Sequence, residues 1–367
     1  MKWKFYSLAF VAGMSILTAC SSDDNNDNDG NGGNGNGNEI ENGTILKGTI
    51  TSDVTLAAGN TYKLSGEYIV EEGGTLHIEE GVKIIAVYDD IADYILVKQG
   101  GKINAVGTPD KPIVMTSEKE EPGAWGGIHI CGRAHTNAEG GKGSSEIGGA
   151  VYGGNDDADN SGTLQYIRLE YTGFAFDEEH EANGISFYGV GNGTIVDHCQ
   201  AYKGSDDGFE FFGGSVNVSN LVAVSCSDDS FDWTEGWNGK GTNLVAYQEA
   251  ESTLGYDCDC LMECDNNGSN NAATPVAHPV LKNLILVGNG GSKQGIRLRA
   301  GTEVEIDNAK VCGKGQPLTV ETALTENALK NGTSKLTNIT LTSELSSKEA
   351  LLVLLVCLCK IFQRTLS

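Results

Sequence analysis

The stretch Ser205–Glu210 reads SDDGFE, and it returns 22 residues later as SDDSFD at Ser227–Asp232. Working outward, Asn220–Ala223 (NLVA) returns 23 residues later at Asn243–Ala246, and loosely as NLIL at Asn283–Leu286. Some twenty residues hold three short strands and three turns, which is one coil of a parallel β-helix. Such a coil buries its apolar face only by stacking on the next. The repeat therefore predicts an all-β chain, folded as a single-stranded parallel β-helix, or solenoid.

Short strands broken by glycine begin near Thr44 and continue through most of the chain. Gly74–Ile78 (GTLHI) alternates apolar and polar residues and is followed by a turn at Glu79–Gly81 and a second apolar run. Alternation of this kind is typical of half-buried strands. A β-sandwich also has short strands and turn signals, but the near-constant spacing of the matching polar residues favours the solenoid.

The composition restricts the classes of partner. The chain has 50 Asp and Glu against 25 Lys and Arg, a formal net charge of −25. A surface this acidic repels nucleic acid and favours divalent cations, or ligands that cations can bridge. No nucleotide-binding pattern is expected, and a hydrophobic content of 39% argues against a disordered chain.

The N-terminal region indicates export and lipid attachment. Residues 1–19 combine Lys2 and Lys4, an apolar stretch and small residues, which predicts a signal peptide. Leu17–Cys20 (LTAC) resembles a lipobox, so we expect lipidation at Cys20. Residues 20–43 then form a hydrophilic Asn/Asp/Gly tether. We expect an outer-membrane lipoprotein that faces the cell exterior, with a periplasm-facing protein as the alternative. Membrane contact would be through the lipid alone.

Acidic side chains fall at equivalent positions of successive coils. Equivalent residues of stacked strands lie about 4.8 Å apart, so Asp206 should lie over Asp228. The same register extends to Asp207 over Asp229 and Glu210 over Asp232, and Glu263 and Asp265 would continue this ladder. Stacked carboxylates repel one another unless they are protonated or bind a cation, and oxygen ligands on turns suit calcium. The alternative is a set of solvated acidic turns that cap the coils through hydrogen bonds.

Several short sequence segments resemble those of a known protein family. They are VEEGGTL at 70–76, GTPDKPI at 107–113, WGGI at 125–128, GIRLRAGT at 295–302, and the two Ser-Asp-Asp-x-Phe segments. Together they resemble right-handed parallel β-helix surface lipoproteins of gut anaerobes, from about Thr44 to Leu341. The resemblance implies a β-helix domain over residues 44–345 and says little about activity.

The two acidic coils also resemble calcium-dependent pectate lyases of the β-helix fold. That resemblance implies calcium bound to an acidic sugar, and a basic side chain that removes a proton so that the glycosidic bond breaks by elimination. The candidate bases by position are Lys240, Lys203, Arg297 and Arg299. A glycoside hydrolase would instead use two carboxylates, which adjacent or alternate coils would space suitably, but no pair is singled out.

Aromatic residues share the register of the acidic ladder. Phe209 should lie over Phe231, and Phe211 over Trp233. Core packing explains Phe209 and Phe231. Phe211, Phe212, Trp233 and Trp237 are candidates for a platform on which sugar rings stack.

Cysteines and the C-terminal segment complete the pattern. Cys258-x-Cys260-x3-Cys264 has no histidine at zinc-finger spacing, so zinc is not expected, and a local disulfide or buried thiols are favoured.

Residues 346–367 form an anomalous apolar tail. Either a reading-frame change produced it, or it caps the last coil.

Together these features predict a monomeric surface lipoprotein whose β-helix binds a polysaccharide or other glycan, with calcium at the acidic ladder. One hypothesis is that the protein also cleaves this glycan. Cleavage would be by a calcium-dependent lyase or, as the lower-ranked reading, by a glycoside hydrolase. The alternative is a non-catalytic adhesin-like or structural surface protein.

Overall fold

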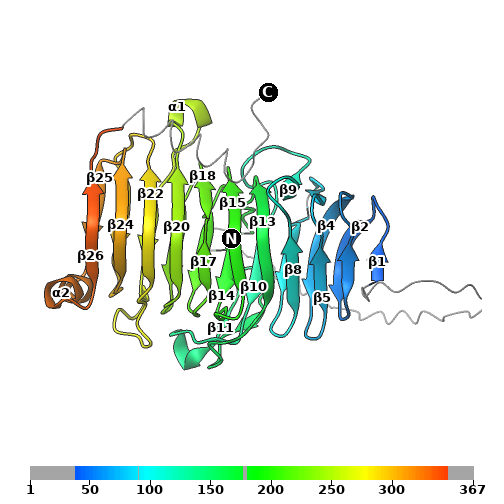
Figure 1. The fold of residues 1–367 in the computed structure, drawn as a ribbon, viewed down its shortest axis with the longest axis horizontal. Coiled ribbons are helices and arrows are strands. Elements are labelled where there is room, and N and C mark those ends of the chain that lie inside the picture. Colours follow the sequence, from blue (N-terminus) through cyan, green and yellow to red (C-terminus); the bar gives the residue numbers. More distant parts are fainter. Residues whose placement is uncertain (1–37, 90, 177–179, 346–367) are drawn as a thin grey trace, which may run out of the picture. The chain divides into compact units, whose positions relative to one another are not determined.

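The computed structural model describes residues 38–89, 91–176 and 180–345. The predicted signal peptide (1–19), Cys20 and the tail 346–367 lie outside these residues, and so does most of the tether. The described chain is a stack of coils whose strands pair in parallel with the strands of the next coil (Figure 1). The prediction of an all-β parallel β-helix is confirmed.

Each coil contributes strands to three parallel faces, which the chain visits in the order I, II, III. Face I contains β1 (Asn38–Ile40), β3 (Val54–Leu56), β5 (Thr75–Ile78), β8 (Lys102–Val106) and β17 (Asn217–Ser219). Face II contains β6 (Lys83–Ala86), β9 (Ile113–Ser117) and β18 (Val222–Val224). Face III contains β7 (Tyr94–Val97), β10 (Ile128–Cys131), β14 (Ile185–Tyr188), β16 (Phe209–Phe212), β19 (Phe231–Thr234), β21 (Met262–Cys264), β23 (Gln294–Leu298) and β25 (Gln316–Val320).

Longer strands bend around a corner and serve two faces. Between faces II and III these are β2 (Ile45–Ile50) and β4 (Thr61–Val70). Between faces I and II they are β13 (Gly162–Glu170), β15 (Ile195–Tyr202), β20 (Lys240–Tyr247), β22 (Val280–Val287), β24 (Glu305–Cys312) and β26 (Lys335–Leu341). Strand β1 pairs in parallel with β3, so residues 38–40 add a strand to the stack before residue 44.

The core is a continuous column of inward-facing apolar side chains. Along β16 of face III, for example, Phe209 and Phe211 are buried in the core, while Glu210 between them points outward. Because a strand alternates its side chains between two faces, this inward column fixes which residues the outer surface presents. None of the described residues forms a helix that is long and apolar enough to cross a membrane.

The corner between faces I and II is held by an asparagine ladder. Asn220, Asn243, Asn283 and Asn308 all have φ between +54° and +64°, a left-handed conformation that asparagine tolerates better than most residues. Each side-chain amide donates to the one before it, at 2.9 Å (Asn243 to Asn220), 3.1 Å (Asn283 to Asn243) and 2.8 Å (Asn308 to Asn283). The NLVA repeat in the sequence marks this corner.

An insertion at residues 132–161 leaves the stack after β10. It contains a short 3-10 helix (Glu139–Gly141) and a hairpin of β11 (Gly143–Ser144) and β12 (Val151–Tyr152). Asn137 in this insertion donates to Asn266 Oδ1 at 2.8 Å and to Pro275 O at 3.0 Å, in the segment that follows β21. The insertion therefore runs along the outside of several coils. Two helices, α1 (Glu251–Leu254) and α2 (Ala323–Asn331), lie in other loops.

Candidate functional site

The acidic residues of successive coils lie over one another as predicted, and they line the outer side of face III. Glu210 in β16 pairs with Asp232 in β19, and Asp232 pairs with Glu263 in β21. All three side chains point outward because their neighbours in sequence fill the core. The predicted continuation of the ladder at Glu263 is therefore confirmed.

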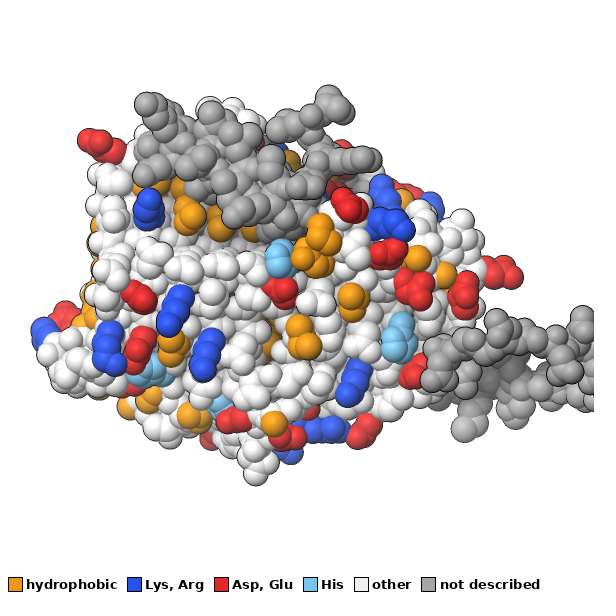
Figure 2. Space-filling view, in the orientation of Figure 1, with side chains coloured by type: hydrophobic (Ala, Val, Ile, Leu, Met, Phe, Trp, Pro, Cys, Tyr) orange, Lys and Arg blue, Asp and Glu red, His pale blue; other side chains and the backbone are white. Residues whose placement is uncertain are grey.

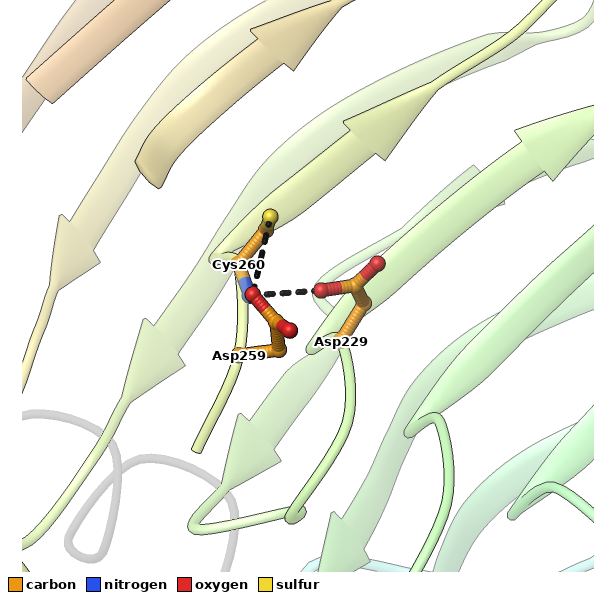
Figure 3. Close-up of side chains that lie close together, drawn as sticks. All are labelled: Asp229, Asp259 and Cys260. Atoms are coloured by element: carbon orange, nitrogen blue, oxygen red, sulfur yellow. Dashed lines mark hydrogen bonds between the residues drawn. The ribbon is translucent and has the colours of Figure 1, made fainter. Parts of the chain in front are cut away.

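The turns before these strands carry the remaining carboxylates. The backbone nitrogen of Asp229 donates to Asp207 Oδ1 at 2.8 Å. One coil later, the backbone nitrogen of Cys260 donates to Asp229 Oδ1 at 2.6 Å (Figure 3). The expectation that acidic turns cap neighbouring coils is correct to this extent.

All six predicted carboxylates come together into contiguous groups. One ligand oxygen from each of Asp206, Asp207 and Asp228 lies within 4.8 Å of the others. The same limit holds for the group Asp207, Glu210 and Asp232, and for the group Asp229, Asp232 and Glu263. Asp207 and Asp232 each belong to two groups, so the ladder is continuous from coil to coil.

Burial and mutual repulsion disfavour the ionised form of these groups. Asp206, which is 9% exposed, has its pKa raised to about 8, mainly by burial and then by Asp228. Burial also raises the pKa of the more exposed Asp228 to about 6. The pKa values of Asp207, Glu210, Asp229 and Asp232 are raised well above the usual carboxyl range by burial and neighbouring carboxylates.

Arginines form ion pairs at the far end of the ladder. Arg297 Nη1 lies 2.8 Å from Glu263, and Arg299 Nε lies 2.7 Å from Asp265; Arg299 also contacts Glu263. By contrast, the six predicted carboxylates form no ion pair with any lysine or arginine among the described residues. The carboxylates without an ion pair are therefore those in the coils of β16 and β19, where Arg299 and Lys293 only partly offset the repulsion at Asp232 and Asp228.

Asn183 is a site residue that the sequence reasoning missed. It is 1% exposed, and its amide nitrogen donates to Glu210 Oε2 at 2.6 Å and to Ser186 Oγ at 3.0 Å. Its Oδ1 has no hydrogen-bond partner among the described residues, and the same holds for Asp232 Oδ1. The signal was present in the sequence: NGISFY at 183–188 has the spacing of DGFEFF at 207–212, with Asn183 in the position of Asp207.

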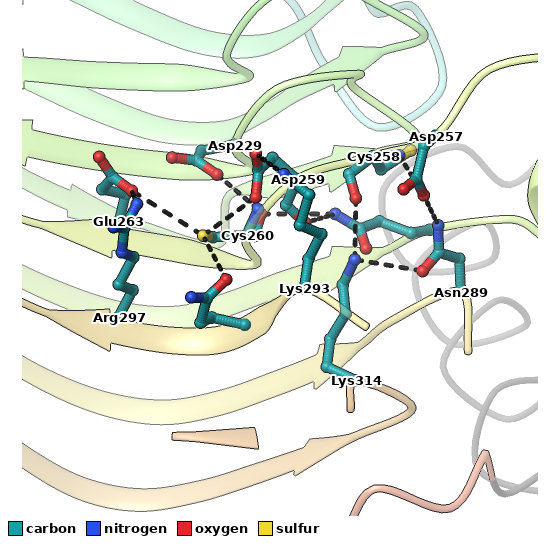
Figure 4. Close-up of polar contacts among 12 residues, drawn as sticks. Asp229, Asp257, Cys258, Asp259, Cys260, Glu263, Asn289, Lys293, Arg297 and Lys314 are labelled. Carbon is teal, nitrogen blue, oxygen red and sulfur yellow. Dashed lines mark hydrogen bonds and ion pairs between the residues drawn. The ribbon is translucent and has the colours of Figure 1, made fainter. Parts of the chain in front are cut away.

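The flank of the ladder is a neutralised polar network (Figure 4). Lys293 Nζ lies 2.6 Å from Asp259 Oδ2. Lys314, which is fully buried, donates to Cys258 O at 2.9 Å and to Asn289 Oδ1 at 3.1 Å. Burial lowers the pKa of Lys314. This side chain ties three coils together beside the ladder.

The predicted bases are not placed as a lyase needs them. Lys240 begins β20 on face I, whose side of the molecule carries basic and acidic side chains intermingled (Figure 2). Lys203 pairs with Glu249 at 3.2 Å. Arg297 and Arg299 do reach the ladder, but their ion pairs raise their pKa values, so neither accepts a proton at neutral pH.

The predicted aromatic platform is wrong. Phe211 is 2% exposed, and Trp233 and Trp237 are each 1% exposed, because all three fill the interior of the coil. The ring of Phe211 stacks on Trp237 with centroids 4.2 Å apart, and the ring of Phe187 stacks on Phe211 at 5.0 Å. Phe212 is 8% exposed and belongs to a buried cluster with Tyr152 and Tyr188. A sugar cannot reach these rings. The aromatic ladder is core packing, as expected for Phe209 and Phe231, whose rings stack at 5.6 Å.

Six cysteines of the described residues are buried, free thiols: Cys131, Cys199, Cys226, Cys258, Cys260 and Cys264. Of the two expectations for Cys258, Cys260 and Cys264, the structure shows buried thiols and no local disulfide. Cys260 Sγ lies 3.4 Å from Asp259 Oδ1, and together with Asp229 these two form a fourth group within 4.8 Å. Burial and the neighbouring carboxylates raise the pKa of Cys260, so the thiol keeps its proton.

The sequence profile described as "Pectate-lyase like beta helix domain" matches residues 48–354. The chain belongs to this family. Membership in the pectate-lyase-like β-helix family confirms the right-handed parallel β-helix fold that the sequence resemblance implied. A comparison with curated proteins finds no significant match.

Among solved structures, the chain is similar to one described as the "Crystal structure of Dettilon tailspike protein (gp208)". The two are 9% identical with a TM-score of 0.32, and the match covers 79% of this chain. The match covers 55% of the tailspike chain, about half its length.

Proposed function

We propose that this β-helix binds a polysaccharide through calcium held at the carboxylate ladder of face III, on a protein anchored by lipid at Cys20 to the outer membrane and facing the exterior. The observation that carries the proposal is the run of six carboxylates in the coils of β16 and β19 that form no ion pair with any described lysine or arginine. Buried carboxylates without a positively charged partner are costly, so this arrangement favours either protonation or a cation.

The residues present fit a calcium ion. Calcium takes six to eight oxygen ligands from carboxylates, amide carbonyls and water in flexible geometry. Asp207, Glu210 and Asp232 offer oxygens within 4.8 Å of one another. Asn183 adds a carbonyl oxygen that has no partner among the described residues. When bound, calcium would neutralise these carboxylates and offer its remaining positions to the hydroxyl or carboxylate oxygens of a sugar.

The chain's own residues set the limits of the binding surface. Arg297 and Arg299 close the ladder at the coil of β23 by pairing with Glu263 and Asp265. At the opposite end, Ser186 and the buried His129 occupy the outward positions in β14 and β10 that precede Glu210. The uncompensated acidic part is therefore short and has one basic end, an arrangement that suits a chain of acidic sugars.

Calorimetry on the soluble domain tests the proposal. We expect calcium to bind, and affinity electrophoresis to show retardation by polygalacturonate or alginate only when calcium is present. The triple variant Asp207→Asn, Glu210→Gln and Asp232→Asn should lose both effects, while Asp110→Asn, at an exposed position, should keep both. Binding that is unchanged by chelator would refute the role of calcium.

The anchoring is tested separately. We expect labelled palmitate to be incorporated into the full chain, and Cys20→Ser to release the protein from the membrane fraction. A protein that remains membrane-bound and unlabelled after this substitution would contradict the lipid anchor.

A further inference from the structure

The outer side of face II carries a stripe of apolar side chains. The strands β15, β18, β20, β22 and β24 lie side by side there in successive coils (Figure 1). Their inward residues, such as Ala223 and Ala246, belong to the main core, so the residues that alternate with these point outward. The outward residues form a separate apolar cluster, here called the face II stripe: Tyr202, Val222, Val224, Val245, Tyr247, Ile285, Val287 and Cys312.

The face II stripe is covered although it faces outward. Val222 is 2% exposed and Val287 is 1% exposed within a single chain, whereas Val106, an outward residue of β8 on face I, is 42% exposed. The loop of α1 reaches one edge of the stripe, where Tyr256 Oη donates to Ser225 O at 2.7 Å. Val222 lies further from that edge, so it needs another cover.

The described part of the chain ends beside the stripe. After β26, the backbone nitrogen of Thr342 donates to Val311 O in β24 at 3.0 Å. Leu345 then lies against Gly313, the residue that follows Cys312 of the stripe. A Cβ atom built on Gly313 would be 2.9 Å from Leu345 Cδ1. The chain therefore leaves the described residues at the end of the stripe where β24 lies.

The sequence that follows Leu345 has the composition that such a surface binds. Residues 350–359 read ALLVLLVCLC and contain no charged or amide side chain. Apolar side chains of this kind are stabilised by burial against other apolar surface. The distance is short, because coils spaced about 4.8 Å apart put β18 about 14 Å from β24. The 22 residues from 346 to 367 span about 33 Å even as a helix, which is enough to cross the stripe.

We propose that residues 350–359 dock on the face II stripe of the same chain and cover the side of the solenoid. This position differs from a cap over the last coil, because the contact runs along the coils of β18 to β24. A second copy of the chain is not required, since Val222 is buried within one chain. The docking needs neither calcium nor a glycan, because it lies on face II and the carboxylate ladder lies on face III.

Thiol labelling in the full chain without its signal peptide tests the cover. Val222→Cys places a thiol in the stripe, and Val106→Cys is the matched control on face I. We expect a maleimide to label position 222 slower than position 106 by about tenfold or more, because a buried thiol reacts only when its cover opens. Adding Leu354→Asp with Leu355→Asp should speed labelling at position 222 by about tenfold and leave position 106 unchanged. Peptide mass spectrometry measures both positions.

A cross-link identifies what covers the stripe. In a Cys312→Ser background, a short bismaleimide should join the thiol of Val222→Cys to Cys357 or Cys359, and it should not join Val106→Cys to either. Mixing chains labelled with a heavy isotope and unlabelled chains shows whether the joined peptides come from one chain, as we expect. This measurement changes nothing in residues 350–359, so it remains decisive if the charged variant unfolds.

Three results would overturn the inference. Cross-links that join labelled to unlabelled chains would make a second copy the occupant of the stripe. Equal labelling of position 222 with and without the two aspartates, at an unchanged melting temperature, would show that residues 350–359 do not cover it. If the two aspartates abolish only the binding of the chain to phosphatidylcholine vesicles, the apolar run contacts lipid and does not dock on face II.

Discussion

The carboxylate of Asp207 accepts a hydrogen bond at 2.8 Å from the backbone nitrogen of Asp229, the equivalent residue one coil further on. The same relationship joins Asp229 to the backbone of Cys260 at 2.6 Å. Each aspartate therefore has a structural role through one oxygen and contributes charge to the ladder through the whole carboxylate. Substitution by asparagine removes the charge and keeps the hydrogen-bond acceptor, whereas substitution by alanine removes both.

Asp207→Asn keeps an acceptor for the Asp229 amide and removes one negative charge. In chelator at pH 8 we expect this variant to be more stable than the wild type. Asp207→Ala leaves a buried amide without a partner, and should be less stable than Asp207→Asn by about 1–3 kcal/mol. Urea denaturation measures both, with Asp110→Asn and Asp110→Ala as the exposed control pair. Equal stability of the two Asp207 variants would show that the hydrogen bond does not matter.

Stability should fall as pH rises when no calcium is present. Folding raises the pKa of Asp206 to about 8 and that of Asp228 to about 6, from an ordinary value of 3.8. The folded protein therefore holds protons that the unfolded chain has lost, so stability is lost between about pH 4 and pH 8. The slope is about 1.4 kcal/mol per pH unit for the proton on Asp206, and it is smaller for the exposed Asp228, whose charge water screens.

Melting temperatures between pH 4.5 and 8.5 in chelator check this dependence. Calcium should restore most of the loss at pH 8, and its binding should release protons, which calorimetry in buffers of different ionisation enthalpy detects. A melting temperature that rises steadily over this range in chelator would contradict the burial of these carboxyls.

Trp237→Ala should act on stability and leave glycan binding unchanged. The ring is 1% exposed and stacks on Phe211, so its loss leaves a core cavity that costs about 3–5 kcal/mol. Binding measured well below the melting temperature should match the wild type, because the ring does not reach the surface. Ile45→Ala, at a position 48% exposed, is the control and should cost little. Selective loss of glycan affinity in a stably folded Trp237 variant would restore the stacking platform.

The asparagine ladder predicts a graded series at Asn283. Asn283→Ala loses the hydrogen bonds to Asn243 and Asn308 and puts alanine at φ +60°, for a cost of about 2–3 kcal/mol. Asn283→Gly removes the backbone strain alone and should cost about 1 kcal/mol less than alanine. Thermal unfolding measures the series, with Asn155→Ala, at an exposed loop position, as the control. Identical costs for alanine and glycine would remove the argument from backbone conformation.

The stacking register could be predicted from sequence because equivalent residues share side-chain type. The SDDGFE repeat placed Asp206, Asp207 and Glu210 correctly over their partners, and the NLVA repeat marked a real corner. The sequence also shows which aromatic side chains face the core. Phe211 and Trp233 follow outward-pointing acidic residues by one position, so strand alternation alone places their rings in the core.

The remaining site residues come from contacts that no period encodes. The pairing of Arg299 with Asp265 joins residues 34 apart, in a longer coil than the 22-residue repeat. Asn183 was recoverable, but only by comparing an amide with a carboxylate at the same position of NGISFY and DGFEFF.

The hydrogen bonds of Asn137 affect how the solenoid unfolds. A solenoid in which each coil contacts only the adjacent coils can unfold from either end, one coil at a time. The bonds from Asn137 to Asn266 and Pro275 span about 130 residues of chain, and they enclose the units built on β14, β16 and β19. While these hydrogen bonds are intact, the coils of β14, β16 and β19 cannot unfold one at a time. The backbone amide hydrogens from β14 to β19 should therefore exchange with solvent deuterium together, and later than those of β23 and β25. Closing so long a loop is slow, and we expect it to limit the rate of refolding.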